Sequence, residues 1–153
     1  MFQRLLTWLF KIRNVSCLPN KLLRGVSADG IDGEGRATAQ LFRFHPSKDR
    51  DNFEEASINW YDNDEAMTIL MSQKKEGTDT IQFPFGVAVM SLERLDEVIR
   101  LSGEELSYER DPIIGNPYHG NILQKSGLQQ ARKRLLAASL ALLCVERIEK
   151  RIP

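Results

Sequence analysis

SGLQQARKRLLAASLALLCVERIEKR, the segment Ser126–Arg151, contains no proline and a single glycine near its start. Its apolar residues recur at steps of three and four, the spacing that places side chains on one face of a helix. The centre is apolar nearly all round, which is typical of a helix covered on more than one side. The segment therefore predicts a long C-terminal core helix, with Leu135, Leu142 and Ile148 buried against a sheet.

The length and composition of the chain indicate one soluble domain. A chain of 153 residues can bury a substantial core, and 42% hydrophobic and 27% charged residues are ordinary for a globular protein. The two cysteines, Cys17 and Cys144, lie far apart and form no metal-ligand spacing. We therefore expect a cytoplasmic protein without a bound metal or cofactor.

The rest of the chain alternates between strand and helix patterns. Strands are expected at 21–26, 36–45, 56–61, 80–90, 104–109 and 118–123, and helices at 65–75 and 91–101. Together these patterns predict an α+β fold. In this fold an antiparallel or mixed sheet packs against the long C-terminal helix, all helices lie on one side, and a single domain spans residues 20–153.

The N-terminal segment, residues 1–16, has the pattern of an amphipathic helix. Its apolar face includes Phe2, Leu5, Trp8 and Leu9. Three roles fit this pattern. The helix packs on its own domain, docks into a protein partner, or anchors the protein to a membrane surface through residues 1–13.

Charge is distributed unevenly along a chain whose net charge is zero. Residues 1–28 contain five basic and no acidic side chains, residues 125–153 contain seven basic and two acidic ones, and the middle of the chain is acidic. One interpretation is a nucleic-acid surface on the basic terminal helices, with Arg132, Lys133 and Arg134 as contacts. The favoured interpretation is that acidic and basic regions pair within one fold or across an assembly.

The segment GNPYHGN, residues 115–121, is the strongest candidate for a site. Glycine and proline hold unusual backbone geometry, and polar side chains held in this way often form functional sites. His119 is the candidate general acid or base, with Tyr118, Asn116 and Asn121 as candidates to orient its ring. The alternative is that these residues only build a turn, since Asn-Pro and His-Gly are common in loops.

No complete catalytic motif is present in the sequence. The favoured prediction is therefore a non-enzymatic binding protein or accessory subunit of a larger bacterial-type assembly. The first alternative is an enzyme centred on His119 that acts on a nucleotide or phosphodiester, and the second is a membrane-surface protein. His45 and His119 would form an acid and base pair for phosphodiester cleavage if both reached one phosphate.

One structural feature separates the enzyme from the binding protein. In an enzyme, His119 is expected to line a pocket with an ionisable or amide group from a distant segment, such as Arg24, His45 or Asp64. In a binding protein, loop backbone is expected to enclose the ring, with no cavity beside it.

Overall fold

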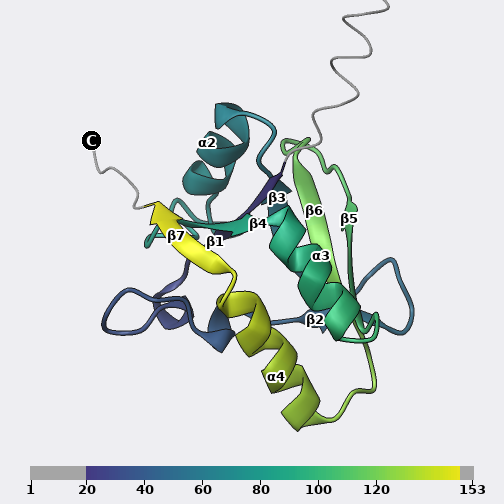
Figure 1. Cartoon of the computed structure of the whole chain (residues 1–153). Helices are drawn as coiled ribbons and strands as arrows, with labels where there is room; N and C mark the ends of the chain where they lie inside the picture. The colour runs from purple at the N-terminus through teal and green to yellow at the C-terminus, as the bar shows by residue number, and fades with distance from the viewer. Residues whose placement is uncertain (1–19, 149–153) are drawn as a thin grey trace, which may run out of the picture.

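The computed structural model describes residues 20–148 as a seven-stranded sheet with helices on both faces (Figure 1). The strands are β1 (Lys21–Gly25), β2 (His45–Pro46), β3 (Phe53–Trp60), β4 (Val87–Ser91), β5 (Leu106–Arg110), β6 (His119–Lys125) and β7 (Cys144–Ile148). The α-helices are α2 (Asp64–Ser72), α3 (Leu92–Leu101) and α4 (Gln130–Ala141), and the short 3-10 helices are η1 (Ala28–Gly30) and η2 (Ala39–Phe42).

The strand order is β5-β6-β3-β1-β4-β7, with β2 pairing on β3. Every pairing is antiparallel, which confirms the antiparallel alternative of the predicted sheet. β3 is the longest strand and is paired with β6 along most of its length. β1 lies in the middle of the sheet although it is the first described element of the chain.

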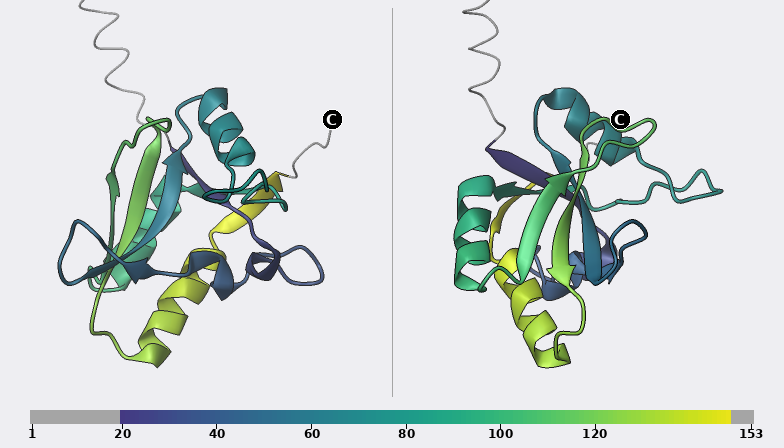
Figure 2. Two further views of the ribbon diagram at one scale, coloured as in Figure 1. Left: turned by 180° about the vertical axis from the view of Figure 1, so that it is seen from behind. Right: turned by 90° about the vertical axis from the view of Figure 1, so that its right-hand side faces the viewer.

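The two faces of the sheet are covered by different helices (Figure 2). Successive residues of a strand point to opposite faces, so Leu22 and Leu23 of β1 belong to separate cores. The Leu22 core is covered by α3 and α4, whereas Leu23 packs with Ala66 and Leu70 of α2. The expectation that all helices lie on one side is therefore wrong.

The long C-terminal helix is shorter than predicted. α4 ends at Ala141, and the chain continues as strand β7. Residues 144–148 pair with the open edge of β4, which satisfies backbone groups that a continued helix would have satisfied internally. Valine and isoleucine suit a strand as well as a helix, so this edge decides the conformation.

The buried residues of α4 and of the turn after it also differ from the predicted ones. Leu136, Leu140 and Leu143 are buried, whereas Leu135 and Leu142 are 55% and 77% exposed. The segment turns after Ala141, so one continuous helical stripe from 128 to 148 does not exist. The burial predicted for Leu135 and Leu142 is wrong.

Two other predicted elements differ from the structure. The predicted strand at 36–45 is instead the 3-10 helix η2, followed by the two residues of β2, because Leu41 and Phe42 turn into the core. The predicted strand at 80–90 is restricted to β4 because Pro84 interrupts it.

The amphipathic helix predicted at 1–16 lies outside the described residues. Within 20–148, none of the helices is both long and apolar enough to cross a membrane.

Candidate functional site

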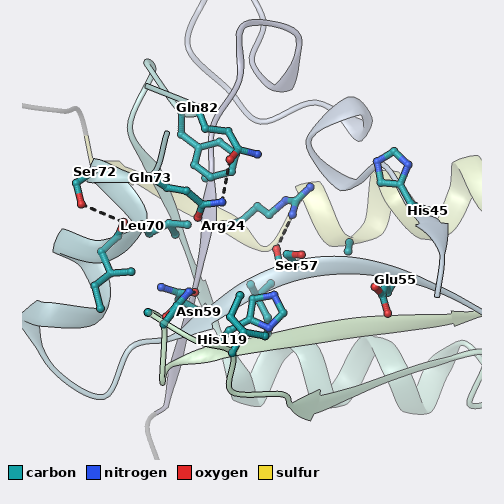
Figure 3. Close-up of a pocket in the computed structure, with 18 of the residues that line it drawn as sticks. Arg24, His45, Glu55, Ser57, Asn59, Leu70, Ser72, Gln73, Gln82 and His119 are labelled. Atoms are coloured by element: carbon teal, nitrogen blue, oxygen red, sulfur yellow. Dashed lines mark hydrogen bonds between the residues drawn. The ribbon is translucent and has the colours of Figure 1, made fainter. Parts of the chain in front are cut away.

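A cavity of about 700 Å³ lies on the α2 side of the sheet (Figure 3). Strand β3 contributes its floor with Glu55, Ser57 and Asn59. The walls come from α2, from the segment that contains Gln82 and Phe83, and from the loop 111–118. Segments that are far apart in the sequence therefore enclose one space.

Strand register brings both histidines to this cavity. Residues 55, 57 and 59 of β3 share one face because side chains alternate along a strand. His119 on β6 is the cross-strand partner of Asn59, and His45 on β2 is the partner of Glu55. The two histidines consequently flank β3 from opposite edges, and both line the cavity.

Arg24, near the end of β1, is part of the cavity lining, although its side chain leaves the sheet on the Leu22 face, where its guanidinium lies over the ring of Phe42. Its Nε donates to the carbonyl oxygen of Leu41 at 3.0 Å, and Nη1 donates to that of Ser57 at 2.5 Å. Burial lowers the pKa of its guanidinium to about 10, because the charged form loses its hydration. No acidic side chain among residues 20–144 forms an ion pair with it.

The thiol of Cys144 does not balance this charge. Burial raises the pKa of Cys144 to about 12, so the thiol is neutral at physiological pH. The guanidinium of Arg24 is therefore held by neutral groups, namely the two carbonyl oxygens and the ring of Phe42, whose centroid lies 5.9 Å from its central carbon. A buried positive charge without an acidic partner lowers the stability of the fold. The same charge can bind an anionic ligand.

The other charged side chains of the cavity are Arg43 and Glu55. The guanidinium of Arg43 forms an ion pair with Asp29 at 2.7 Å and donates to Gln40 at 3.0 Å, so its charge is already balanced. The carboxylate of Glu55 is partly buried and forms no ion pair within the described part of the chain.

The ring of His119 is held in one tautomer. Its Nδ1 lies 2.7 Å from the main-chain oxygen of Asp111. A carbonyl oxygen only accepts hydrogen bonds, so Nδ1 must carry the proton. In the neutral ring Nε2 therefore keeps its lone pair and is available as a proton acceptor, which is the form that a general base requires.

The three residues expected to orient this ring make other contacts. Asn116 lines the cavity and donates from Nδ2 to Asn59 at 2.8 Å. The hydroxyl of Tyr118 accepts from Asn63 and donates to Glu65, at the start of α2. Asn121 donates to the carboxylate of Asp111 at 3.1 Å. Asp111, which sequence reasoning did not single out, holds the ring directly.

Asn59 joins three of the segments that form the cavity. Its side chain is 1% exposed, donates to the carbonyl of Ala66 on α2 at 2.9 Å and accepts from Asn116 at 2.8 Å. We predict that Asn59→Ala lowers the free energy of unfolding by about 1–3 kcal/mol, because both partners lose their hydrogen bond. Urea denaturation measures this change.

The control for this prediction is Gln73→Ala. Gln73 is exposed and pairs with Gln82 through an exposed hydrogen bond, so the expected change is within about 0.5 kcal/mol. Equal losses in the two variants would contradict a special role for the Asn59 network.

The residues predicted to bind a partner or nucleic acid fall into three groups. Arg132 and Lys133 form ion pairs with Glu105 and Glu54, at 2.6 and 2.7 Å. Arg134 is exposed on α4. Phe2, Leu5, Trp8 and Leu9 lie outside the described residues. Of the three basic side chains, Arg134 is the one that forms no ion pair within the described part of the chain.

Within residues 20–148 no three histidine, cysteine or acidic side chains are grouped as a metal site requires. The chain was compared with protein-family models, curated proteins and solved structures. None of the family models, curated proteins or solved structures matches the chain.

Proposed function

We propose that the protein is an enzyme, that the 700 Å³ cavity is its active site, and that its substrate is a nucleotide or another phosphodiester. The observation that carries this proposal is that His119 lines the cavity together with Arg24 and His45. This is the arrangement expected of the enzyme alternative, and it differs from a ring enclosed by loop backbone.

The two side chains have complementary roles in this proposal. Arg24 contacts an oxygen of the phosphate, where its charge stabilises the negative charge of the transition state. His119 accepts a proton at Nε2 from the attacking group. The main-chain carbonyl of Asp111 keeps the ring in the required tautomer throughout.

The size of the cavity fits a small substrate. Pockets that bind small molecules generally have volumes of about 300–1,000 Å³. The walls combine apolar groups such as Ile69 and Phe83 with amides such as Gln73 and Asn116. Such a lining suits an organic substrate that carries both an apolar ring and polar substituents.

The enzyme is preferred here over the accessory subunit favoured from the sequence. The subunit prediction depends on the lack of a complete catalytic motif in the sequence, on residues 1–16, which are outside the described part of the chain, and on basic residues of which two are paired with acids. A role in binding a protein partner or a membrane surface stays a prediction. We also propose a cytoplasmic location, which suits the free thiol of Cys144.

Ligand binding by an Arg24→Met variant tests the proposal. Calorimetric titration of mononucleotides and dinucleotides into the wild-type protein identifies a ligand. Arg24→Met is then expected to weaken its binding by about tenfold to a hundredfold, because a hydrogen bond to a charged group contributes about 1.5–3 kcal/mol. Arg134→Met, at an exposed site outside the cavity lining, is the matched control and is expected to bind as the wild type does. Equal affinities of all three proteins, or no binding of any phosphate compound, would rule out the proposal.

A further inference from the structure

The geometry points to Ser57 as the nucleophile of the reaction: its hydroxyl attacks the phosphorus, His119 takes the hydroxyl proton, and the phosphoryl group is carried for a time on Ser57. This inference rests on the proposed function and deepens it by naming the attacking group. Three features carry it: the exposure of Ser57 in the cavity, the state of its hydroxyl, and the direction of the His119 ring.

The hydroxyl of Ser57 is open to a ligand. Ser57 is the exposed residue of β3 and lies on the floor of the cavity. The other serine of the described lining is Ser72, whose hydroxyl donates to the main-chain oxygen of Thr68 at 2.8 Å and is thereby tied to α2. The main-chain oxygen of Ser57 accepts from Arg24, but its hydroxyl forms no hydrogen bond to the described residues. Its proton can therefore pass to a base, and its lone pairs can attack a substrate.

Strand register places the ring of His119 beside this hydroxyl. Ser57 pairs with Asn121 of β6, and His119 lies two positions before Asn121 on the same face of the sheet. Such diagonal neighbours on adjacent strands are about 7–8 Å apart, within reach of aromatic and long side chains. Figure 3 shows the ring of His119 extending toward Ser57 from its place opposite Asn59.

The ring of His119 is prepared to act as the base for this hydroxyl. Nδ1 donates to the main-chain oxygen of Asp111, so Nε2 keeps the lone pair. The carboxylate of Asp111 lies 3.9 Å from Nδ1, and its negative charge stabilises the positive ring that forms when Nε2 takes a proton. Nε2 and the Ser57 hydroxyl form no hydrogen bond in this structure, and such a bond commonly tightens only when the substrate binds.

The reaction then has two steps. In the first, Oγ of Ser57 forms a bond to phosphorus while its proton passes to Nε2 of His119. The bond between phosphorus and one ester oxygen breaks, and that oxygen takes the proton from Nε2 and leaves as an alcohol. In the second step a water oxygen attacks the same phosphorus and gives a proton to Nε2. The bond to Oγ breaks, Oγ takes this proton, and a phosphomonoester is released.

Labelling with diisopropyl fluorophosphate tests the nucleophile. This reagent transfers its phosphoryl group to an activated serine hydroxyl and releases fluoride, and mass spectrometry of peptides locates the bound group. In the full-length wild-type protein we expect a label on Ser57 and none on Ser72. His119→Gln is expected to slow the labelling by about 10²-fold or more, because the base is lost. An unlabelled Ser57, or equal labelling rates in His119→Gln and the wild type, would overturn the inference.

Turnover of bis(p-nitrophenyl) phosphate tests the covalent route. Ser57→Ala is expected to lower kcat by at least about 10³-fold. Ser139→Ala removes the same group from α4, outside the cavity lining, and its kcat is expected to stay within about twofold of the wild type. The double variant Ser57→Ala/His119→Gln is expected to lose no more than Ser57→Ala alone, because a nucleophile and its base act as a unit.

Full activity of Ser57→Ala, or additive losses in the double variant, would mean that His119 activates water directly. That outcome would overturn the inference and leave the proposed enzyme in place. Labelling of Ser57 without binding or turnover of any phosphate ester would uphold the nucleophile and refute the proposed substrate. Absence of binding, turnover and labelling in the wild type would refute the proposed function itself.

Discussion

Replacing His119 with glutamine is expected to lower kcat on a phosphodiester by about 10²–10⁴-fold, the usual contribution of a general acid or base. Glutamine has a similar size, and its amide can still donate to the carbonyl of Asp111, but it cannot accept the proton of the attacking water. Initial rates of the purified variant measure the loss. Thermal unfolding shows whether the fold is retained, and the melting temperature is expected to change little.

Tyr118→Phe is the matched control for this prediction. Tyr118 precedes His119 in the chain, but its hydroxyl bonds to Asn63 and Glu65 and is not part of the cavity lining. Its kcat is expected to stay within about twofold of the wild type, as for a side chain that does not touch the substrate. A loss in Tyr118→Phe as large as in His119→Gln, or full activity of His119→Gln, would indicate that the loop has only a structural role.

Leu140→Ala is expected to lower the free energy of unfolding by about 2–5 kcal/mol. Leu140 is fully buried in the core between α4 and the sheet, so its truncation removes apolar contacts and leaves a space that neighbours fill only in part. Leu142→Ala, two residues later, removes the same atoms from a side chain that is 77% exposed. Its expected effect is within about 0.5 kcal/mol.

Urea denaturation of both leucine variants checks this pair. Because the two substitutions are chemically identical, the difference between them reports the burial of each position. A larger loss for Leu142→Ala would mean that the helix presents its other face to the sheet.

Local patterns predicted most elements of the sheet, because a strand such as β1 or β6 is defined by the alternation of its own residues. The C-terminal segment was predicted less well for a physical reason. Val145 and Ile148 fit both a helical step of three and a strand edge, and the choice depends on the free edge of β4, more than fifty residues earlier. A contact between distant segments leaves no periodicity in either of them.

In the candidate site, too, local sequence patterns predict some features, whereas others depend on contacts between distant segments. His119 stands out because glycine, proline and asparagine surround it. The group that holds its ring is the main-chain oxygen of Asp111, and every residue has such an oxygen, so no sequence pattern identifies it. Arg24 did leave a signal, as an arginine within an apolar strand beside Leu22 and Leu23. Its lack of an acidic partner is visible only in the folded chain.

The order of the strands has a consequence for how the protein is made. The central strands β1 and β3 are synthesised early, but β3 pairs with β6, so that Asn59 meets His119 only after sixty more residues have been added. Sheets built from such distant pairs generally fold in milliseconds to seconds, since a long loop must close before its contacts are gained. During synthesis β3 therefore presents an unpaired edge that can join other chains. The cavity forms only once β6 has been released from the ribosome, and an N-terminal fragment that ends before His119 is expected to aggregate and to lack activity.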